Sequence, residues 1–133
     1  MTTESYPLYS ADDVVRWLDA GACIVAVRDA MAGLTAGGFE QPLRNIVSMG
    51  AGQMFALMPG VGHEALGFGA KIISVFPDGA RAGRSRHRGV VVLFDRSGGR
   101  VQCVADAGAI TEIRTGCASA VATDVLARRD ARV

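Results

Sequence analysis

Residues 89–106 read Gly89-Val-Val-Val-Leu-Phe-Asp95, Arg96-Ser-Gly-Gly99, Arg100-Val-Gln-Cys-Val-Ala-Asp106. Two apolar, β-branched runs therefore flank a short polar connection with two glycines, a pattern typical of a β-hairpin. The next segment, residues 109–127, predicts a helix with one apolar stripe: Ile110, Ile113, Cys117, Val121 and Val125. Strands joined by a hairpin and followed by a helix favour an α+β fold over alternating βαβ units.

The segments before this hairpin extend the same pattern. Residues 43–49 and 53–58 predict two strands joined across Gly50-Ala-Gly52, and residues 66–76 predict a third strand that Pro77-Asp78-Gly79 ends. Nearer the N-terminus, Ser10 followed by Asp13 predicts a capped helix that Gly21 interrupts, and a second helix covers 22–35 up to Gly37-Gly38. We therefore predict one α+β domain over residues 1–133, with N-terminal helices, a mixed sheet of about five or six strands and a C-terminal helix.

The composition excludes several classes of function. The chain has 133 residues, of which 50% are hydrophobic and 20% charged, as in an ordinary globular domain. Its net charge of +1 provides no general field for polyanions, so we expect no nucleic-acid partner. Cys23, Cys103 and Cys117 show no C-x-x-C spacing, which argues against a disulfide framework and a metal site. No secretory signal pattern or membrane-length apolar run is present, so we expect a cytoplasmic protein with no membrane partner.

Lys71 is the best single pointer to a functional site. It is the only lysine among fourteen basic residues, and it lies inside the apolar run of residues 66–76. A charged ammonium in a buried strand costs free energy unless an anion or a hydrogen-bonding group meets it. The alternative is a lysine whose aliphatic stem lies along the sheet while its ammonium reaches water.

Two arginines extend this hypothesis. Arg44 falls inside a predicted strand, and Arg114 falls in the last helix, next to Thr115 and three residues after Thr111. An arginine presents a planar fork that suits a carboxylate or phosphate, whereas a lysine supplies a point charge. The three cations could converge on one anionic group, although an arginine or lysine taken singly is more often a salt-bridged structural residue.

Two further motifs are weaker. Residues 60–65, Gly60-Val-Gly62-His-Glu-Ala65, match a G-x-G-x-x-A dinucleotide fingerprint, but a strand follows instead of the helix that this motif requires, so we interpret them as a loop. A basic stretch between two strands is either a solvated connection or an anion-binding loop; it contains Arg81, Arg84, Arg86, His87 and Arg88.

Four segments taken together resemble the N-terminal part of the ornithine cyclodeaminase/mu-crystallin family. The I-T-x-x-R-T core of the last one is the most specific, and the segments are Phe55-Ala-Leu-Met-Pro59, Gly69-Ala-Lys71-Ile-Ile-Ser-Val-Phe-Pro77, His87-Arg-Gly-Val-Val-Val-Leu-Phe-Asp95 and residues 106–120. The resemblance implies a substrate-binding and dimerisation domain with an open, strongly curved sheet that joins the sheet of a second subunit. It also implies a following Rossmann domain for NAD(H) or NADP(H), and oxidoreductase or cyclodeaminase chemistry on a small amino or imino acid.

The resemblance also implies roles for individual residues. Arg44, Lys71 and Arg114 match the clamp for the substrate carboxylate, with Lys71 as a catalytic residue, and Arg114 and Thr115 fall where the family approaches the cofactor phosphates. No metal ligands are implied. The chain departs from the family pattern at Arg86, where a small hydroxyl residue often precedes the histidine, and at Ala107, where glycine is commoner.

No Rossmann fingerprint appears up to Val133, so we expect a domain truncated before its cofactor-binding half, or one completed by a separate Rossmann-domain chain. A chain without that half should not bind NAD(H) or NADP(H) alone. The alternatives are a non-catalytic dimeric module that binds a small ligand and an inactive fragment.

Overall fold

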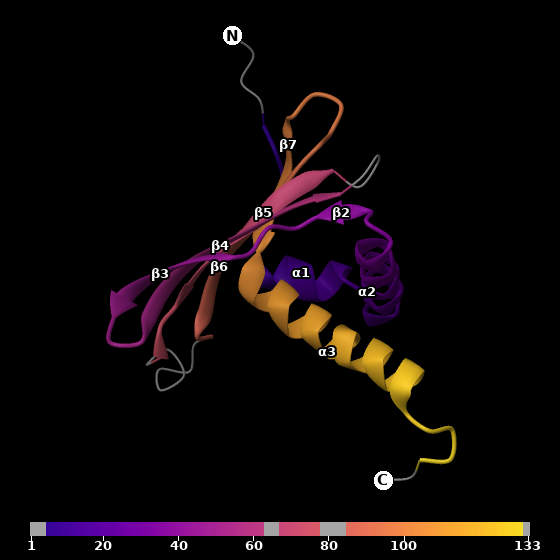
Figure 1. The fold of residues 1–133 in the computed structure, drawn as a ribbon. Coiled ribbons are helices and arrows are strands. Elements are labelled where there is room, and N and C mark those ends of the chain that lie inside the picture. The colour runs from indigo at the N-terminus through magenta and orange to yellow at the C-terminus, as the bar shows by residue number, and fades with distance from the viewer. Residues whose placement is uncertain (1–4, 63–66, 78–84, 132–133) are drawn as a thin grey trace.

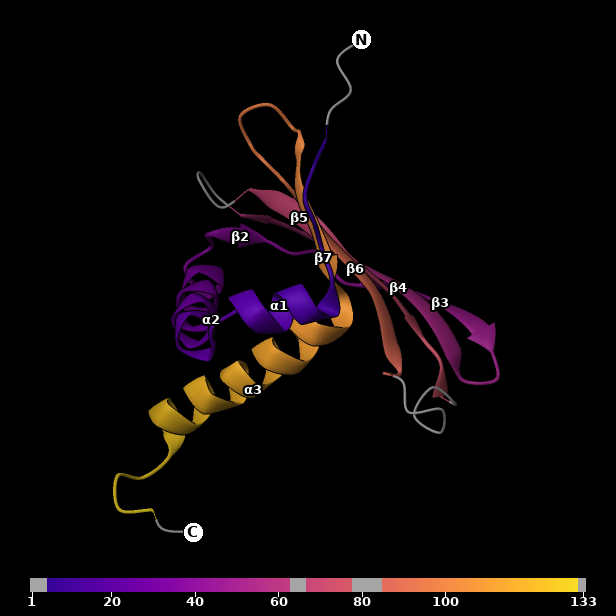
Figure 2. The same cartoon turned by 180° about the vertical axis from the view of Figure 1, so that it is seen from behind.

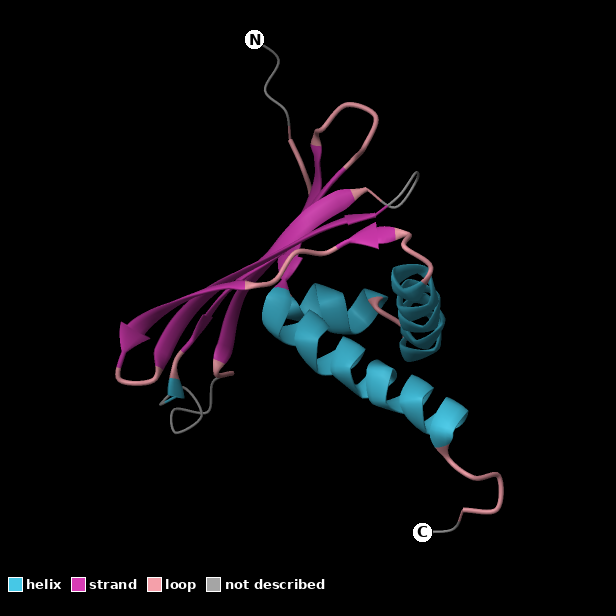
Figure 3. Ribbon diagram, viewed as in Figure 1, coloured by secondary structure: helices cyan, strands magenta, loops and turns pink. Residues whose placement is uncertain are grey.

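The computed structural model describes residues 5–62, 67–77 and 85–131. These residues form an α+β fold with an open mixed sheet, which confirms the predicted fold class (Figure 3). The helices are α1 (Ala11–Trp17), α2 (Ala20–Thr35) and α3 (Ala107–Leu126). The strands are β1 (Leu8–Tyr9), β2 (Phe39–Glu40), β3 (Asn45–Gly50), β4 (Gln53–Gly62), β5 (Phe68–Val75), β6 (His87–Phe94) and β7 (Val101–Asp106).

The sheet is built around the long antiparallel strands β4, β5 and β6. The strand order is β1-β7-β6-β5-β4-β2, and β3 also pairs with β4. All neighbours are antiparallel except β1, which runs parallel to β7. Lys71 lies in β5, the central strand of this trio, directly opposite Met58 of β4 and Val91 of β6. The register therefore surrounds the lysine stem with apolar neighbours.

The helices pack on one side of the sheet, as two opposite views show (Figures 1 and 2). Ile73 of β5 is buried with Ala56 of β4 and Ala107, the first residue of α3, and partly buried side chains of Met58, Val75 and Val91 pack against them. Because side chains alternate along a strand, Lys71 shares the face of Ile73 that the helices cover. The small core thus places Lys71 between the sheet and α3.

Helix starts follow the local sequence closely. Ser10 and Asp13 form the predicted capping box of α1, and Asp106 caps α3 through its bond to the Ala109 amide. The prediction that Gly21 separates the first two helices was wrong. The break lies at Leu18 and Asp19, where the Asp19 carboxylate accepts from the Ala22 amide and caps α2, so that Gly21 falls inside α2.

The strand predictions were right in type and order, with three differences in extent. β1 and β2, of two residues each, were not predicted, so the described sheet has seven strands. β4 continues to Gly62, so Gly60–Gly62, interpreted as a loop, belong to a strand; residues 63–65 of that motif lie outside the described ones. Arg44 precedes β3 instead of lying inside a strand, because the ladder with β4 begins at Asn45.

One glycine allows close pairing at the start of β6. Gly89 has φ of 156° and lies opposite Ile73, and any side chain there would run into the Ile72 carbonyl. The close approach keeps β5 and β6 in register next to the core residue Ile73.

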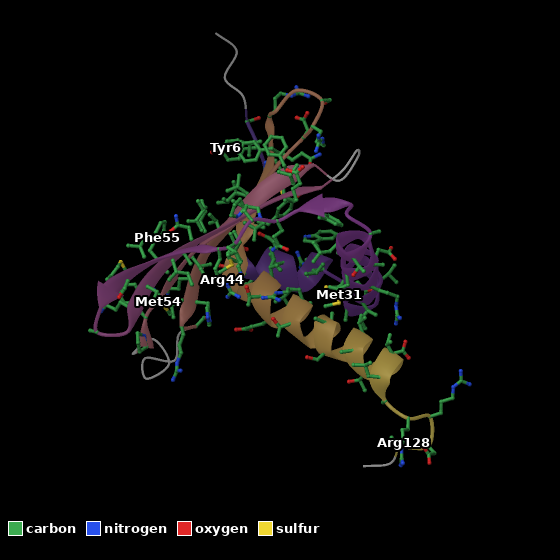
Figure 4. The ribbon with its side chains drawn as sticks, in the orientation of Figure 1. Tyr6, Met31, Arg44, Met54, Phe55 and Arg128 are labelled. Carbon is green, nitrogen blue, oxygen red and sulfur yellow. The ribbon has the colours of Figure 1, made fainter. Side chains whose placement is uncertain are left out.

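The second face of the sheet carries exposed apolar side chains. Phe55 and Leu57 of β4 alternate with the core residue Ala56 and are 44% and 37% exposed, and Val47, directly opposite Phe55, is 54% exposed. Phe55 lies on the part of the sheet that extends beyond the helices (Figure 4). This face of the sheet therefore exposes several neighbouring apolar side chains.

Candidate functional site: a cationic cavity between the sheet and two helices

Lys71 forms the centre of the candidate site. Its side chain is partly buried, and its Nζ donates to Oγ1 of Thr111 in α3 at 3.5 Å. The strand fixes the stem of the lysine between Met58 and Val91, while the helix provides the hydroxyl. The ammonium therefore projects from the sheet toward α3 and does not simply follow the sheet surface into water, as the structural alternative required.

Lys71 lines a cavity of about 500 Å³. Arg114 of α3 lines the same cavity, so the structure brings these two predicted cations together. The rest of the wall is largely apolar and comes from α2 and from β2, β4, β5 and β6; it includes Val27, Met31, Leu34, Phe39, Met58, Val91 and Leu93. A cationic end and an apolar wall suit an anionic group attached to an uncharged body.

The pKa of Lys71 is shifted by burial and by two nearby arginines. Burial lowers the pKa of Lys71 below its usual value, and the positive charges of Arg114 and then Arg44 lower this pKa further. Both arginines are therefore close enough to act on the ammonium, although they come from different parts of the chain. An anion that binds among the three cations would relieve this repulsion and raise the Lys71 pKa again.

The other two predicted site residues, Arg44 and Thr115, do not line the cavity. Arg44, labelled in Figure 4, is exposed just before β3 and acts on Lys71 through its charge without lining the cavity. Thr115 follows Arg114 on α3, is exposed, and does not line the cavity either. Its backbone carbonyl accepts from the Ser119 hydroxyl.

The basic loop is only partly described. His87 and Arg88 open β6, and with Ser85 they line a second cavity, of about 320 Å³, beside the first turns of α1 and α3. Arg86 is exposed, whereas Arg81, Arg84 and His63 lie outside the described residues. No group of three or more His, Cys, Asp or Glu side chains in the described part of the chain is arranged to hold a metal ion. No described helix has both the length and the apolar character needed to cross a membrane.

Sequence reasoning missed Thr111 as a partner of Lys71 and α2 as a wall of the cavity. The sequence shows that Thr111 lies three residues before Arg114, but no periodicity indicates its contact with Lys71, which is 40 positions away. For α2 a signal existed: Val27, Met31 and Leu34 are spaced i, i+4 and i+7, which predicts one apolar helix face. Met31 is labelled on α2 in Figure 4.

Comparison with known proteins agrees with the fold. The model of the ornithine cyclodeaminase/mu-crystallin family matches residues 7–133. Delta(1)-pyrroline-2-carboxylate reductase of Bacillus cereus is 35% identical over 92 residues, which are 68% of this chain and 28% of that protein. Ketimine reductase mu-crystallin of Mus musculus is 31% identical over 91 residues, 68% of this chain and 29% of that protein.

Among solved structures, Thermococcus litoralis Delta(1)-pyrroline-2-carboxylate reductase in complex with NADH and L-proline superimposes with a TM-score of 0.87 at 28% identity. The match covers 95% of this chain and 39% of the Thermococcus protein. An archaeal alanine dehydrogenase dimer with bound NAD shares the fold, with a TM-score of 0.85 at 21% identity over 94% of this chain and 38% of its own. The chain thus spans less than half the length of the relatives it matches. The family match over nearly all its residues nevertheless shows that this protein belongs to the ornithine cyclodeaminase/mu-crystallin family.

Proposed function

We propose that this chain is the substrate-binding part of an NAD(P)-dependent oxidoreductase that holds an amino or imino acid by its α-carboxylate. The observation that carries the proposal is the arrangement of Lys71 and Arg114 on one cavity, with the charge of Arg44 close by. The three cations come from separate elements and repel one another in the free protein. A bound carboxylate would neutralise part of this charge, which explains why the fold tolerates them together.

The two lining cations have different tasks in this proposal. The planar guanidinium of Arg114 binds both carboxylate oxygens and fixes the plane of the group, while Lys71 adds a point charge from the sheet side. Together they hold the α-carbon in one orientation, which a hydride transfer requires. When bound, the nicotinamide supplies the hydride. As the catalytic residue, Lys71 orients the substrate and also stabilises charge that develops during the reaction.

The wall of the cavity favours a substrate with an uncharged, apolar body. Among the residues that the structure describes, Glu40 of β2, which follows Phe39, is the one acidic residue on the wall. The Phe39 ring packs on α2, where a methyl group added to Gly33 would lie 2.8 Å from it. Because most of the described wall is apolar, we propose a cyclic imino acid in preference to a diamino acid, whose second ammonium would meet no acidic side chain there other than exposed Glu40.

The cofactor contact is proposed for Arg114 and Thr115, adjacent residues on α3. Thr115 is exposed beside the cavity and offers a hydroxyl, and Arg114 offers a guanidinium, so both can meet a phosphate. These residues cover a small part of a dinucleotide. We expect the chain alone to bind neither NAD(H) nor NADP(H) measurably, since the relatives match it over only part of their length.

A homodimer is proposed on the exposed apolar face of the sheet, the face of Val47, Phe55 and Leu57. Burial of this face against a second copy would remove apolar area from water, at about 25 cal/mol for each Å². The alanine dehydrogenase of similar fold is a dimer, which supports this assembly.

Calorimetric titration of L-proline into wild-type protein and Lys71→Met tests the proposed function. We expect saturable binding by the wild type and at least a tenfold loss in Lys71→Met, because about 1.4 kcal/mol corresponds to tenfold and an ionic hydrogen bond contributes more than that. Lys71→Arg serves as a control that keeps the charge. Equal binding by wild type and Lys71→Met would contradict the carboxylate clamp.

A further inference from the structure

The hydroxyl of Thr111 is used differently from most hydroxyls on the same helices. Thr35, Ser119 and Thr123 each donate to the backbone carbonyl four residues earlier in their own helix. Thr111 instead accepts from Nζ of Lys71, a residue on the central strand of the sheet. Among the described residues this contact is one of few polar links between α3 and the sheet, and it forms at the partly buried cationic end of the cavity.

Thr111 also lies on the same face of α3 as Arg114. Residues three apart in a helix lie on the same face, so α3 presents the hydroxyl and the guanidinium toward the same region. Asp106 caps α3 through the Ala109 amide, which anchors the first turn just before Thr111. The helix therefore holds both groups on one rigid element.

We propose that Thr111 is a positioning residue that holds the Lys71 ammonium in place for the substrate carboxylate. An ammonium has three N–H donors, and the hydroxyl accepts one of them, leaving two for the ligand. A mobile lysine side chain, with four methylene groups, loses conformational entropy when its ammonium binds a ligand. A side chain that is already held in place loses less, so binding costs less free energy. The role of Thr111 in ligand binding rests on the proposed function, whereas the Lys71–Thr111 contact is independent of it.

The single lysine makes a direct test possible. Protein grown with ¹³C- and ¹⁵N-labelled lysine shows the signals of one side chain, Lys71. The variants are Thr111→Val, which removes the hydroxyl at constant shape, and Thr111→Ser, which keeps it. Thr123→Val is the matched control, because it makes the same change on α3 where the hydroxyl bonds only its own helix.

The ligand-free spectra come first. We expect Thr111→Val to change the Lys71 Cε and Nζ shifts and to increase the mobility of the side chain, while Thr111→Ser and Thr123→Val resemble the wild type. Unchanged Lys71 signals in Thr111→Val would overturn the proposal. Backbone amide spectra show whether each variant is folded. If Thr111→Val does not fold, the test rests on Thr111→Ser, whose Lys71 signals must match those of the wild type for the proposal to stand.

L-Proline titrations follow on the same samples. We expect Thr111→Val to bind roughly 3- to 10-fold more weakly, the effect of one hydrogen bond, with rescue in Thr111→Ser. Equal affinity in Thr111→Val and wild type would show that the contact does not serve the ligand and would overturn the proposal. If the wild type bound no L-proline, the proposed function would fail, and the ligand-free spectra would still decide the role of Thr111.

Discussion

The guanidinium of Arg28 in α2 lies 2.7 Å from the carboxylate of Asp124 in α3, and this ion pair joins the two helices beside the cavity. Deeper between the same helices, the Cys117 thiol donates to the Ala20 carbonyl at 3.6 Å, and Cys23 and Cys117 are each 5% exposed. Helices α2 and α3 therefore contact one another through the buried cysteines Cys23 and Cys117 and, nearer the surface, through the Arg28–Asp124 ion pair. These two contacts should contribute very differently to stability.

Arg28→Ala should have little effect on the free energy of unfolding. Arg28 and Asp124 side chains are 44% and 70% exposed, and exposed ion pairs contribute about 0–1 kcal/mol. Urea unfolding of Arg28→Ala checks this, with Arg128→Ala as the control, since Arg128 forms an ion pair with Asp130 beyond the end of α3. A loss above about 2 kcal/mol would mean that the pair is coupled to the helix core.

Cys23 and Cys117 should resist thiol reagents in the folded protein. Burial raises the pKa of the Cys23 thiol, and its hydrogen bond to Cys117 and the charge of Cys117 raise this pKa further. Burial also raises the pKa of Cys103. Because the thiolate is the reactive form, Ellman's reagent at neutral pH should react slowly until the protein is unfolded. Rapid reaction of Cys23 in native protein, located by mass spectrometry, would show that the α2–α3 contact opens readily.

Lys71→Met should stabilise the fold while it removes ligand binding. The pKa of Lys71 is lowered in the folded protein, so between the usual value of 10.5 and the lowered value the unfolded chain binds a proton that the folded chain does not. Stability of the wild type therefore falls as the pH falls through this window, and the loss persists at neutral pH.

The methionine variant lacks this loss, so we expect it to have a larger free energy of unfolding than the wild type at pH 7. Denaturation of both proteins from pH 7 to 11 measures the difference, which should shrink toward high pH. A variant less stable than wild type at pH 7 would show that Lys71 has a favourable partner stronger than the Thr111 hydroxyl.

Phe55→Glu should convert the proposed dimer into a monomer. The substitution places a charge on the exposed sheet face, where Phe55 and Val47 are directly opposite one another. A charge that is buried without a partner opposes association strongly. Sedimentation velocity gives the assembly state, with Val25→Glu on α2 as a control at an exposed apolar position away from the sheet. A monomeric wild type, or a Phe55→Glu protein that still dimerises, would contradict the assignment of this face.

Local signals in the sequence predicted most of the fold. The capping box of Ser10 and Asp13 and the glycine-containing connection at residues 96–99 depend on neighbours a few positions away, and both occur as predicted. By contrast, β1 exists only through its pairing with β7, and β2 only through its pairing with β4. A two-residue strand has no period of its own, so tertiary pairing alone defines it.

The candidate site likewise has some features that the sequence predicted and others that only the structure shows. The cost of burying a charge singled out Lys71 without any structure, and the chemistry of the guanidinium together with the I-T-x-x-R-T resemblance singled out Arg114. The common cavity, the Thr111 contact and the position of Arg44 before β3 depend on sheet register and helix packing. The role of these residues in binding a carboxylate stays a prediction that needs a ligand.

The most direct measurement is the response of the Lys71 side-chain signals to L-proline and to L-prolinamide, which lacks the carboxylate. With labelled lysine, we expect L-proline to shift the Lys71 Nζ and Cε signals saturably and to raise the Lys71 pKa, with a weaker effect in Arg114→Met. L-Prolinamide should leave the signals unchanged. No shift with L-proline up to roughly 0.1 M, or equal shifts with both compounds, would contradict a carboxylate site at Lys71.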